Sequence, residues 1–405
     1  MRSIAIADSD SYLKWAAAFL GALPEASDRE LILIETPVLP SESQRGAALA
    51  VVGVDPEHLL CLPLPKLLTT LRREQPDAVL VALRGPVAAV LIRMIAELPH
   101  RPVIVTGLPG ISIPATRKAL AFRRQADLFV LHSRREIREF TRLSRERGWT
   151  HRFALATLPF VEERTGPGGG DLVFAAQAQV PRMRDDRLRL LGVLLAAARA
   201  DPSRRVVIKV RALAGEQQTH VEDVGYPELL EELAATTEVP GNLVVSGEPM
   251  SVALDSAHGL VTVSSTASIE AVARGIPVIA LDSFGVSDRL INSVFEGSGL
   301  FGDDEAVVRR EFRHPEPAWL GDNYFHPAEA DDVAGQLQAL VAARRQGVLP
   351  AREPARRPGG RLRLAWDRKR AFGDSDRTMS GAVALAVGTP AHATVQAARK
   401  MKRAL

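Results

Sequence analysis

The amino-acid sequence predicts an α/β protein built from two Rossmann-like domains that face each other across a cleft. Short runs rich in Val, Ile and Leu alternate with stretches whose apolar residues recur at three- and four-residue spacing, which is typical of βα units around a parallel sheet. A glycine-rich segment interrupts this alternation once, at residues 162–170, and the alternation then begins again. The chain has 405 residues, which is too long for one ordinary core and sufficient for two.

The first domain is expected to span residues 1–161. Its predicted strands contain continuous apolar runs, which indicates burial on both faces, and they lie at Ser3–Ala7, Glu30–Glu35, Ala78–Leu83, Pro102–Thr106, Asp127–Leu131 and Arg152–Ala156. Helices are predicted between them at Pro65–Arg73, Val87–Leu98, Ala115–Arg124 and Arg135–Glu146. Ligands of such sheets bind beyond the carboxyl ends of the strands, so we expect functional residues in the loops there.

Residues 162–170 are predicted to be the interdomain linker because they are charged and rich in glycine. The second domain is expected to span residues 171–346. Its predicted strands are Leu172–Ala176, Arg205–Val210, Leu243–Ser246, Gly259–Ser264 and Pro277–Asp282. Its predicted helices are Arg184–Ala200, Tyr226–Thr236, Ser268–Arg274 and Ala328–Arg345.

Residues 347–405 are predicted to be a basic, partly disordered C-terminal extension. From residue 352 onward the chain holds 13 Lys or Arg and 4 Asp or Glu, although the net charge of the whole chain is only +3. The alkaline character therefore belongs to this extension and does not indicate a nucleic-acid-binding face, so no nucleic-acid partner is expected. The extension is either a solvated tail or a contact with an anionic membrane surface.

The composition fits a cytoplasmic protein. Cys61 is the one cysteine, which excludes an internal disulfide and a cysteine-based zinc site. The first residues turn acidic too soon for a secretory signal, and no apolar run approaches the ~20 residues needed to cross a bilayer.

One motif carries the most chemical information. A predicted strand ends in three consecutive hydroxyl residues, a helix begins at once, and Gly275 then suits the end of that helix. The exposed N–H groups at a helix start favour a phosphate, whereas a cap alone needs one hydroxyl, so the surplus indicates a ligand. Glu270 lies one turn inside the helix among apolar neighbours and needs a polar partner. The alternative is a plain βαβ unit with a capped helix. The hydroxyl triplet consists of Ser264, Ser265 and Thr266.

The run from Ser264 to Val278 resembles the nucleotide-binding element of GT-B enzymes that build bacterial surface glycans, including polysialyltransferases, capsule Kdo transferases and glycerophosphotransferases. From Ile4 to about Ala342, the chain is similar to an actinobacterial family of proposed glycosyltransferases. The resemblance implies a GT-B fold in which the hydroxyl triplet holds the donor phosphate and Glu270 holds the ribose. It also implies that the first domain binds the acceptor and the second the nucleotide-sugar donor.

Two further strand ends match the donor side of this resemblance. Related enzymes carry Lys-x-His-Pro where this chain has Lys209 and then Arg211. Arg211 can bind phosphate but cannot give up a proton, so it implies electrostatic stabilisation of the leaving nucleotide. His220 is a possible replacement imidazole or a solvated loop residue. Weaker contacts to the donor are expected from Ser246, Gly247, Glu248, Gln177 and Gln179. The alternative is that these residues simply form loops.

The catalytic base belongs in the first domain, but the acidic motif of the related enzymes is not evident there. The best substitutes are Asp8 and Asp10, because a carboxylate at the end of the first strand is aimed at the cleft. Asp8 could instead cap the following helix. The spacing Asp8-Ser9-Asp10 also matches a DxD metal motif of another fold, but its position disfavours a metal. Gly107 and Gly110, in the turn after the predicted strand Pro102–Thr106, could let the backbone approach a ligand closely. Further cleft candidates are Arg84 and Ser133, each equally able to cap a helix or lie at the surface.

The sequence thus predicts a metal- and cofactor-independent glycosyltransferase of surface polysaccharide biosynthesis. Its donor is expected to be a nucleotide sugar, with a CMP-linked nonulosonic acid as one possibility, and its acceptor a glycan or a lipid-linked hydroxyl at the membrane. Two alternatives stand beside this function: a sugar-nucleotide epimerase of the same shape, and a degenerate protein that binds a nucleotide sugar without chemistry. The absence of an evident acidic motif is the main evidence for the second alternative.

Overall fold

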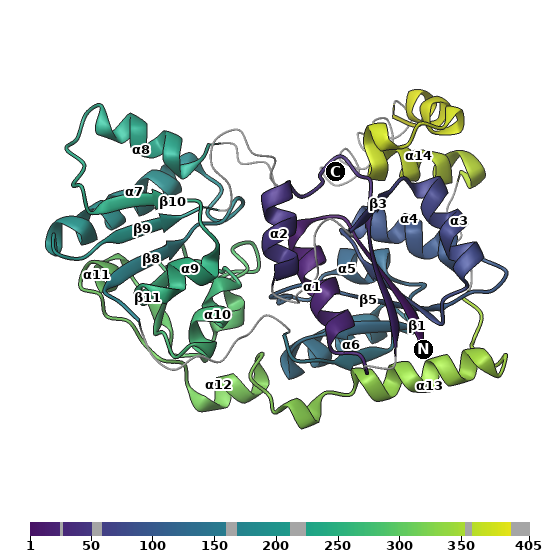
Figure 1. Ribbon diagram of the computed structural model, residues 1–405. Helices are drawn as coiled ribbons and strands as arrows, with labels where there is room; N and C mark the ends of the chain where they lie inside the picture. Colours follow the sequence, from purple (N-terminus) through teal and green to yellow (C-terminus); the bar gives the residue numbers. More distant parts are fainter. Residues whose placement is uncertain (25–26, 51–58, 159–167, 211–223, 353–358, 390–405) are drawn as a thin grey trace, which may run out of the picture.

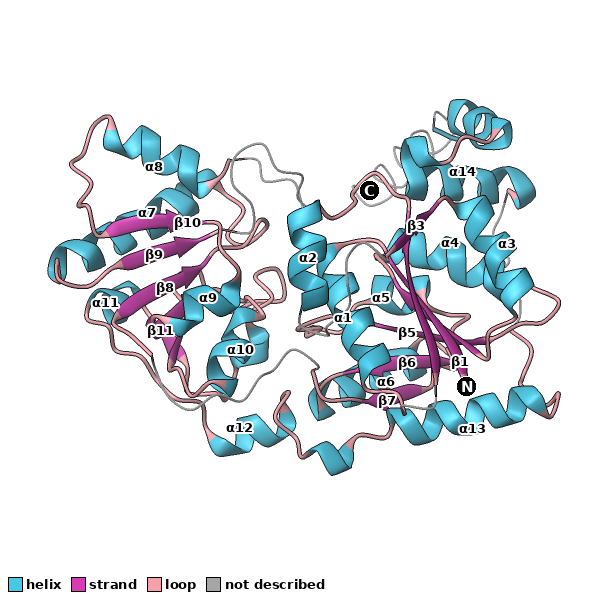
Figure 2. Ribbon diagram, viewed as in Figure 1, coloured by secondary structure: helices cyan, strands magenta, loops and turns pink. Residues whose placement is uncertain are grey.

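The computed structural model describes residues 1–24, 27–50, 59–158, 168–210, 224–352 and 359–389. These residues form two parallel-sheet α/β domains side by side, with strands that point toward the other domain (Figures 1 and 2). The predicted fold class of two Rossmann-like domains is therefore confirmed. No helix of the described ranges combines the length and the apolar character that a membrane span requires.

The N-terminal domain is built on a seven-stranded sheet in the order β3-β2-β1-β4-β5-β6-β7, with all neighbours parallel. Its strands are β1 (Arg2–Ala7), β2 (Asp28–Ile34), β3 (Leu60–Leu62), β4 (Ala78–Ala82), β5 (Val103–Gly107), β6 (Leu128–Leu131) and β7 (Phe153–Leu155). Its helices are α1 (Asp10–Gly21), α2 (Glu42–Ala50), α3 (Leu64–Glu74), α4 (Gly85–Ala96), α5 (Arg117–Phe122) and α6 (Arg134–Glu146). The ranges predicted from the sequence did not include β3 or α2, and α1 was expected only as a helix after Asp8, without bounds.

Alternating side chains of the central strands divide the core of this domain into two layers. Ala5 and Ala7 pack with α1 on one face of the sheet, whereas Ile4 and Ile6 pack with α3 and α4 on the other. Successive strand residues point to opposite faces, so a strand that is apolar throughout supplies both layers. This explains why the strands read as continuous apolar runs.

The C-terminal domain has a six-stranded sheet in the order β10-β9-β8-β11-β12-β13, again parallel. Its strands are β8 (Asp171–Ala175), β9 (Val206–Lys209), β10 (Leu243–Ser246), β11 (Ala257–Thr262), β12 (Val278–Leu281) and β13 (Phe301–Gly302). Its helical segments are α7 (Arg184–Ala200), α8 (Tyr226–Ala234), α9 (Met250–Asp255), α10 (Ala267–Ala273), η2 (Ser293–Phe295), α11 (Asp304–Val308) and α12 (Pro317–Asp322).

The described end of the predicted linker already packs on the C-terminal domain. A Cβ on Gly168 would lie 2.2 Å from the carbonyl oxygen of Asp255, and one on Gly169 would lie 2.3 Å from that of Ser256. Glycine is needed there because no side chain fits between the two backbones. Residues 162–167 lie outside the described residues.

The chain then returns to the N-terminal domain, which corrects the predicted domain boundary at residue 346. After η3 (Ala328–Ala330), helix α13 (Val333–Arg345) packs its apolar side chains Leu337 and Leu340 into the core layer that contains Ala5. In Figure 1, α12 and α13 run beneath both domains. The apolar spacing of α13 predicts a helix but not the sheet that it covers, because any parallel sheet offers a similar face.

The two segments that cross between the domains are hydrogen-bonded to each other. Asp332 accepts a hydrogen bond from the backbone N–H of Leu155 at 2.8 Å, and Asp331 accepts one from that of Thr157 at 2.8 Å. His326 contacts the other oxygen of Asp331 at 2.8 Å. These two carboxylates, beside the buried His326, connect the outgoing and returning segments of the chain at one place.

Within the extension, which was expected to be partly disordered, residues 360–389 form helices. Helix α14 (Gly360–Phe372) is followed by η4 (Gly373–Ser375) and by a helix over residues 379–389. Phe372 is 1% exposed and belongs to the core layer that contains α3 and α4. One buried aromatic side chain is enough to anchor a short helix to a domain, and local composition does not reveal where that side chain docks. Residues 390–405 lie outside the described residues.

Replacing the anchoring ring should destabilise the N-terminal domain. Phe372→Ala is expected to lower the free energy of unfolding by about 3–5 kcal/mol, because a fully buried phenyl leaves a cavity. The measurement is urea denaturation followed by circular dichroism. Met379→Ala is the matched control, since Met379 is 85% exposed, and it should change stability by less than about 0.5 kcal/mol. Equal midpoints for Phe372→Ala and wild type would show that α14 does not dock.

Candidate functional site

The hydroxyl triplet lies at the point where the strand order of the C-terminal sheet reverses, between β8 and β11. Gln177 follows β8 and Ser264 follows β11. The side-chain oxygen of Gln177 accepts hydrogen bonds from the N–H of Ser264 at 3.0 Å and from its hydroxyl at 3.2 Å. Ser264 is only 4% exposed. In this structure its hydroxyl joins two strand ends and is not presented to a ligand, which corrects the role predicted for it.

The other two hydroxyls of the triplet are half-buried. The Ser265 hydroxyl accepts a hydrogen bond from the N–H of Ala267 at 3.2 Å and therefore caps α10. Thr266 is the N-cap residue of α10, yet its side chain makes no cap bond. Gly275 has a φ of +68°, which agrees with its predicted role just after the helix. Glu270 lies in the first turn of α10 and is half-buried.

Thr266 instead faces the loop that follows β5 of the other domain. Its hydroxyl lies 3.5 Å from the N–H of Ile111, and a Cβ on Gly110 would lie 2.7 Å from it. A side chain at residue 110 would force the Thr266 side chain or the loop to shift. Gly110 therefore permits a close contact between the carboxyl edges of the two sheets, although the sequence predicted this freedom for a ligand.

Gly107 has a different role. A Cβ there would lie 2.5 Å from the ring of Trp15, whose N–H donates to the Nε2 atom of His132 at 2.9 Å. The Nδ1 atom of His132 contacts the carbonyl of Ala156 at 2.8 Å, and burial lowers the pKa of this histidine to about 4. Gly107 thus leaves room for a buried Trp–His pair in the core and does not line the cleft.

Glu136 organises the same loop and was not singled out from the sequence. It lies in the first turn of α6 and is 0% exposed. Its carboxylate accepts hydrogen bonds from the N–H of Ser112 at 2.8 Å, the N–H of His132 at 2.8 Å and the hydroxyl of Tyr324 at 2.6 Å. Burial raises its pKa to about 7, against the opposing effect of these donors. The available signal was the spacing Ser133-x-x-Glu136 after a strand, because Ser133 accepts from the N–H of Glu136 at 3.0 Å as a helix cap.

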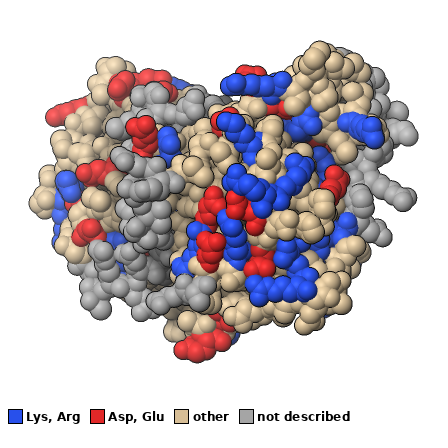
Figure 3. Space-filling view, turned by 45° about the vertical axis from the view of Figure 1, so that its right-hand side comes forward, with Lys and Arg blue, Asp and Glu red and all other residues tan. Residues whose placement is uncertain are grey.

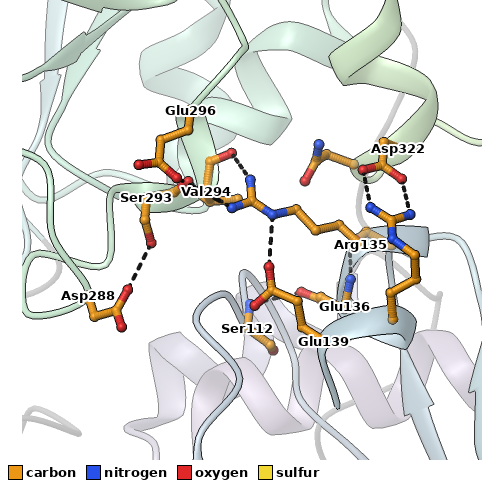
Figure 4. Close-up of polar contacts among 12 residues, drawn as sticks. Ser112, Arg135, Glu136, Glu139, Asp288, Ser293, Val294, Glu296 and Asp322 are labelled. Carbon is orange, nitrogen blue, oxygen red and sulfur yellow. Dashed lines mark hydrogen bonds and ion pairs between the residues drawn. The ribbon is translucent and has the colours of Figure 1, made fainter. Parts of the chain in front are cut away.

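Next to this group, α6 holds the C-terminal domain through two arginines (Figure 4). Arg135 donates to the carbonyls of Ser293 and Val294, each at 3.1 Å. Arg138 forms a bidentate ion pair with Asp322 at 2.5 and 2.6 Å. A cavity of about 620 Å³ is lined by Arg135, Arg138 and Asp322. A smaller one of about 220 Å³ also lies beside Arg135.

The predicted base is placed unfavourably. Asp8 is 0% exposed and lies 2.9 Å from Nε of Arg84, which in turn donates to the hydroxyl of Thr36 at 3.1 Å. Burial raises the pKa of Asp8, and Arg84 opposes that shift. Asp10 starts α1, and its carboxylate accepts from the N–H of Ser11 at 2.6 Å. The first carboxylate is enclosed by its ion pair and the second serves the helix start, so neither is positioned as a base in this structure.

The remaining predicted contacts are dispersed. Lys209 is 6% exposed, and its ammonium donates to the carbonyl of Val210. The Ser246 hydroxyl accepts from the N–H of Glu248 at 3.2 Å, and Gly247 and Glu248 are exposed. These residues follow β9 and β10, one and two strands away from β8. Arg211 and His220 lie outside the described residues. In the described ranges, no group of three or more His, Cys, Asp or Glu side chains is arranged to hold a metal ion.

Comparisons with known proteins agree with this architecture. Residues 3–340 match the family described as "Putative glycosyltransferase (DUF6716)". No curated protein matches the sequence significantly.

Among solved structures, a "putative UDP-N-acetylglucosamine 2-epimerase from Listeria monocytogenes" is similar with a TM-score of 0.53 at 12% identity, over 85% of this chain and 95% of that one. The S. aureus MnaA-UDP structure is similar with a TM-score of 0.51 at 13% identity, over 87% and 98%. At such identities the likeness shows the fold alone, which is GT-B-like.

The Glu136 group predicts a pH dependence of stability. Its folded pKa of about 7 exceeds the ordinary value of 4.5, so its contribution is complete below pH 4.5 and is lost as the pH rises through 7. Glu136→Gln lacks this titration and places an amide N–H₂ among donors, so it is destabilised. Its deficit relative to wild type should be largest near pH 5 and shrink by up to about 3 kcal/mol by pH 8.

Denaturant midpoints measured across that pH range test this prediction. Glu146→Gln, at the exposed end of the same helix, controls for the substitution itself. A deficit of Glu136→Gln that grows with pH would contradict the raised pKa.

Proposed function

Because the chain belongs to the family described as "Putative glycosyltransferase (DUF6716)", we propose that it transfers a sugar from a nucleotide-activated donor to an acceptor hydroxyl. The observation that carries the proposal is the contact of Thr266 with Gly110 and Ile111. It brings the strand-order reversal of the C-terminal sheet against a loop at the carboxyl edge of the N-terminal sheet. Parallel sheets bind ligands at such edges, so donor and acceptor would meet there.

The donor phosphates are proposed to lie against Ser265, Thr266 and the start of α10. Both side chains are half-buried, and Thr266 spends no hydrogen bond on capping the helix. Ser264 supports the site through Gln177. The charges of Lys209 and Arg211 after β9 would favour the departing nucleotide, and Glu270 is proposed to bind the ribose. A fixed set of donors aimed at developing charge supplies most of such catalysis.

The finer substrate assignment extends the sequence resemblance. We propose a CMP-linked nonulosonic acid as one donor to test, and a glycan or lipid-linked hydroxyl as the acceptor. A lipid-linked acceptor would place the protein at a membrane surface. Neither Asp8 nor Asp10 is assigned as the catalytic base, because of where this structure places their carboxylates.

A ligand screen tests the donor. Thermal shifts with CMP-, UDP-, GDP- and CDP-linked sugars should identify one nucleotide class that raises the melting temperature, because a ligand that binds the folded state stabilises it. Ser265→Ala should weaken that ligand about tenfold or more, since a hydrogen bond to a charged group is lost. Ser251→Ala, an exposed serine on α9, is the matched control. Stabilisation by none of the four classes, or equal affinities for both variants, would contradict the donor site.

An epimerase is the second candidate, because the two similar structures reported above with a TM-score over 0.5 include one described as a UDP-N-acetylglucosamine 2-epimerase. The two functions differ in what acceptor-free protein does to its donor. A transferase should release nucleotide slowly by hydrolysis and leave every stereocentre of the sugar other than the anomeric carbon unchanged in NMR spectra. Interconversion of two sugar nucleotides would establish the epimerase, and binding without any turnover would establish a non-catalytic protein.

A further inference from the structure

We propose that the C-terminal hairpin, formed by α14 and the helix over residues 379–389, docks on an anionic lipid bilayer. The contact surface is an apolar row on the outer face of the second helix, and the same hairpin carries exposed arginines on α14 and between its two helices. The hairpin packs on α4 of the N-terminal domain, at the upper right of Figure 1 and away from the C-terminal domain. This inference goes beyond glycosyl transfer and is independent of which sugar is transferred.

Small residues form the inner face of the second helix. Ala384 is 0% exposed and clusters with Trp366 of α14. A Cβ on Gly388 would lie 2.4 Å from the Trp366 ring, and one on Gly381 would lie 2.6 Å from the Asp376 carboxylate. The helix therefore approaches α14 with its least bulky residues, so its large apolar side chains are left to point elsewhere.

Those large side chains point outward. Met379, Val383 and Val387 are 85%, 56% and 54% exposed, and their spacing of four residues places them on one face of the helix. Leu362 on α14 is 45% exposed. The sequence from residue 378 to residue 398 contains no Asp, Glu, Lys or Arg. A surface helix normally presents polar side chains to water, and a contiguous apolar surface of this kind marks an interaction site.

The charged side chains of the hairpin indicate which kind of partner its apolar surface contacts. Two acidic groups of the hairpin are held in close ion pairs, Asp367 with Arg363 at 3.1 Å and Asp376 with Arg368 at 2.9 Å, while Asp374 is fully exposed and lies 3.8 Å from Lys369. Three exposed arginines have no ion pair among the described residues, and they are Arg361, Arg370 and Arg377. In Figure 3 the top right of the molecule, at the height of α14 in Figure 1, is largely uncharged with basic side chains below it.

An apolar surface on a hairpin that also carries exposed arginines fits a bilayer with anionic headgroups. Apolar side chains enter the interface while cations are attracted to the negative surface. A second copy of this chain fits less well, because a symmetric contact would bring the arginines of both copies together. An uncharged lipid surface would use the apolar row but would gain nothing from the arginines.

Flotation of the full-length protein with vesicles tests the proposal. We expect binding to vesicles of phosphatidylglycerol and phosphatidylcholine, weaker binding to phosphatidylcholine alone, and a loss with added salt. The triple variant Met379→Ser, Val383→Ser, Val387→Ser should lower partitioning about tenfold or more, since three side chains no longer enter the interface. The double variant Arg361→Gln, Arg377→Gln should lose most of the preference for anionic vesicles.

The matched control is Met183→Ser with Val252→Ser, which removes exposed apolar side chains of 57% and 45% exposure from the C-terminal domain. It should bind vesicles like wild type. Unchanged melting temperatures would show that all variants are folded, as expected for exposed sites. Failure of the wild type to bind, equal binding by the triple variant, or equal binding of the arginine variant to both vesicle types would overturn the proposal. So would a dimer in sedimentation velocity that the triple variant abolishes without any lipid binding.

Discussion

The relative orientation of the two domains is held by hydrogen bonds at the place where the chain crosses between them twice. Asp331 and Asp332, on the returning segment, accept from backbone N–H groups of the outgoing segment at Thr157 and Leu155. A single crossing would leave each domain free to turn about one flexible connection. Two crossings bonded to each other restrict that rotation, so the carboxyl edges of both sheets remain directed at one another.

The contacts around this crossing differ greatly in how easily they can be broken. The bond from Tyr324 to Glu136 is fully buried, and opening it would strand polar groups, which costs more than the bond is worth in water. The Arg138–Asp322 pair is largely exposed, with 61% and 34% of its side chains accessible, and such pairs contribute about 0–1 kcal/mol. The contact of Ile111 with Thr266 at 3.5 Å is equally weak. Relative domain motion would therefore separate the loops at the proposed donor site before it disturbed Glu136.

Sequence reasoning succeeded where local pattern determines the outcome. β1 and β8 contain the continuous apolar runs Ile4–Ala7 and Leu172–Ala175 because both faces of each strand are buried, and that pattern is visible without knowledge of the partners. The destination of α13 and the anchoring of Phe372 depend on which distant surface accepts them, and nothing in their own residues specifies it. Glu136 was missed for the same reason, since two of its donors, Ser112 and Tyr324, are 24 and 188 residues away.

The hydroxyl triplet shows how a sound argument from residue type can still misplace a role. A surplus of hydroxyls over the one needed for a cap was taken to indicate a ligand, but one surplus hydroxyl joins β11 to β8 through Gln177 and another faces the opposite domain. To donate to a phosphate, the Ser264 hydroxyl would have to give up its hydrogen bond to Gln177, and at 4% exposure Ser264 is not presented to a ligand. The Thr266 hydroxyl has no such bond to give up, because its contact is a weak one with a loop of the other domain. Of the three residues, Ser265 and Thr266 are therefore the two proposed at a donor phosphate, because their present hydrogen bonds cost the least free energy to replace.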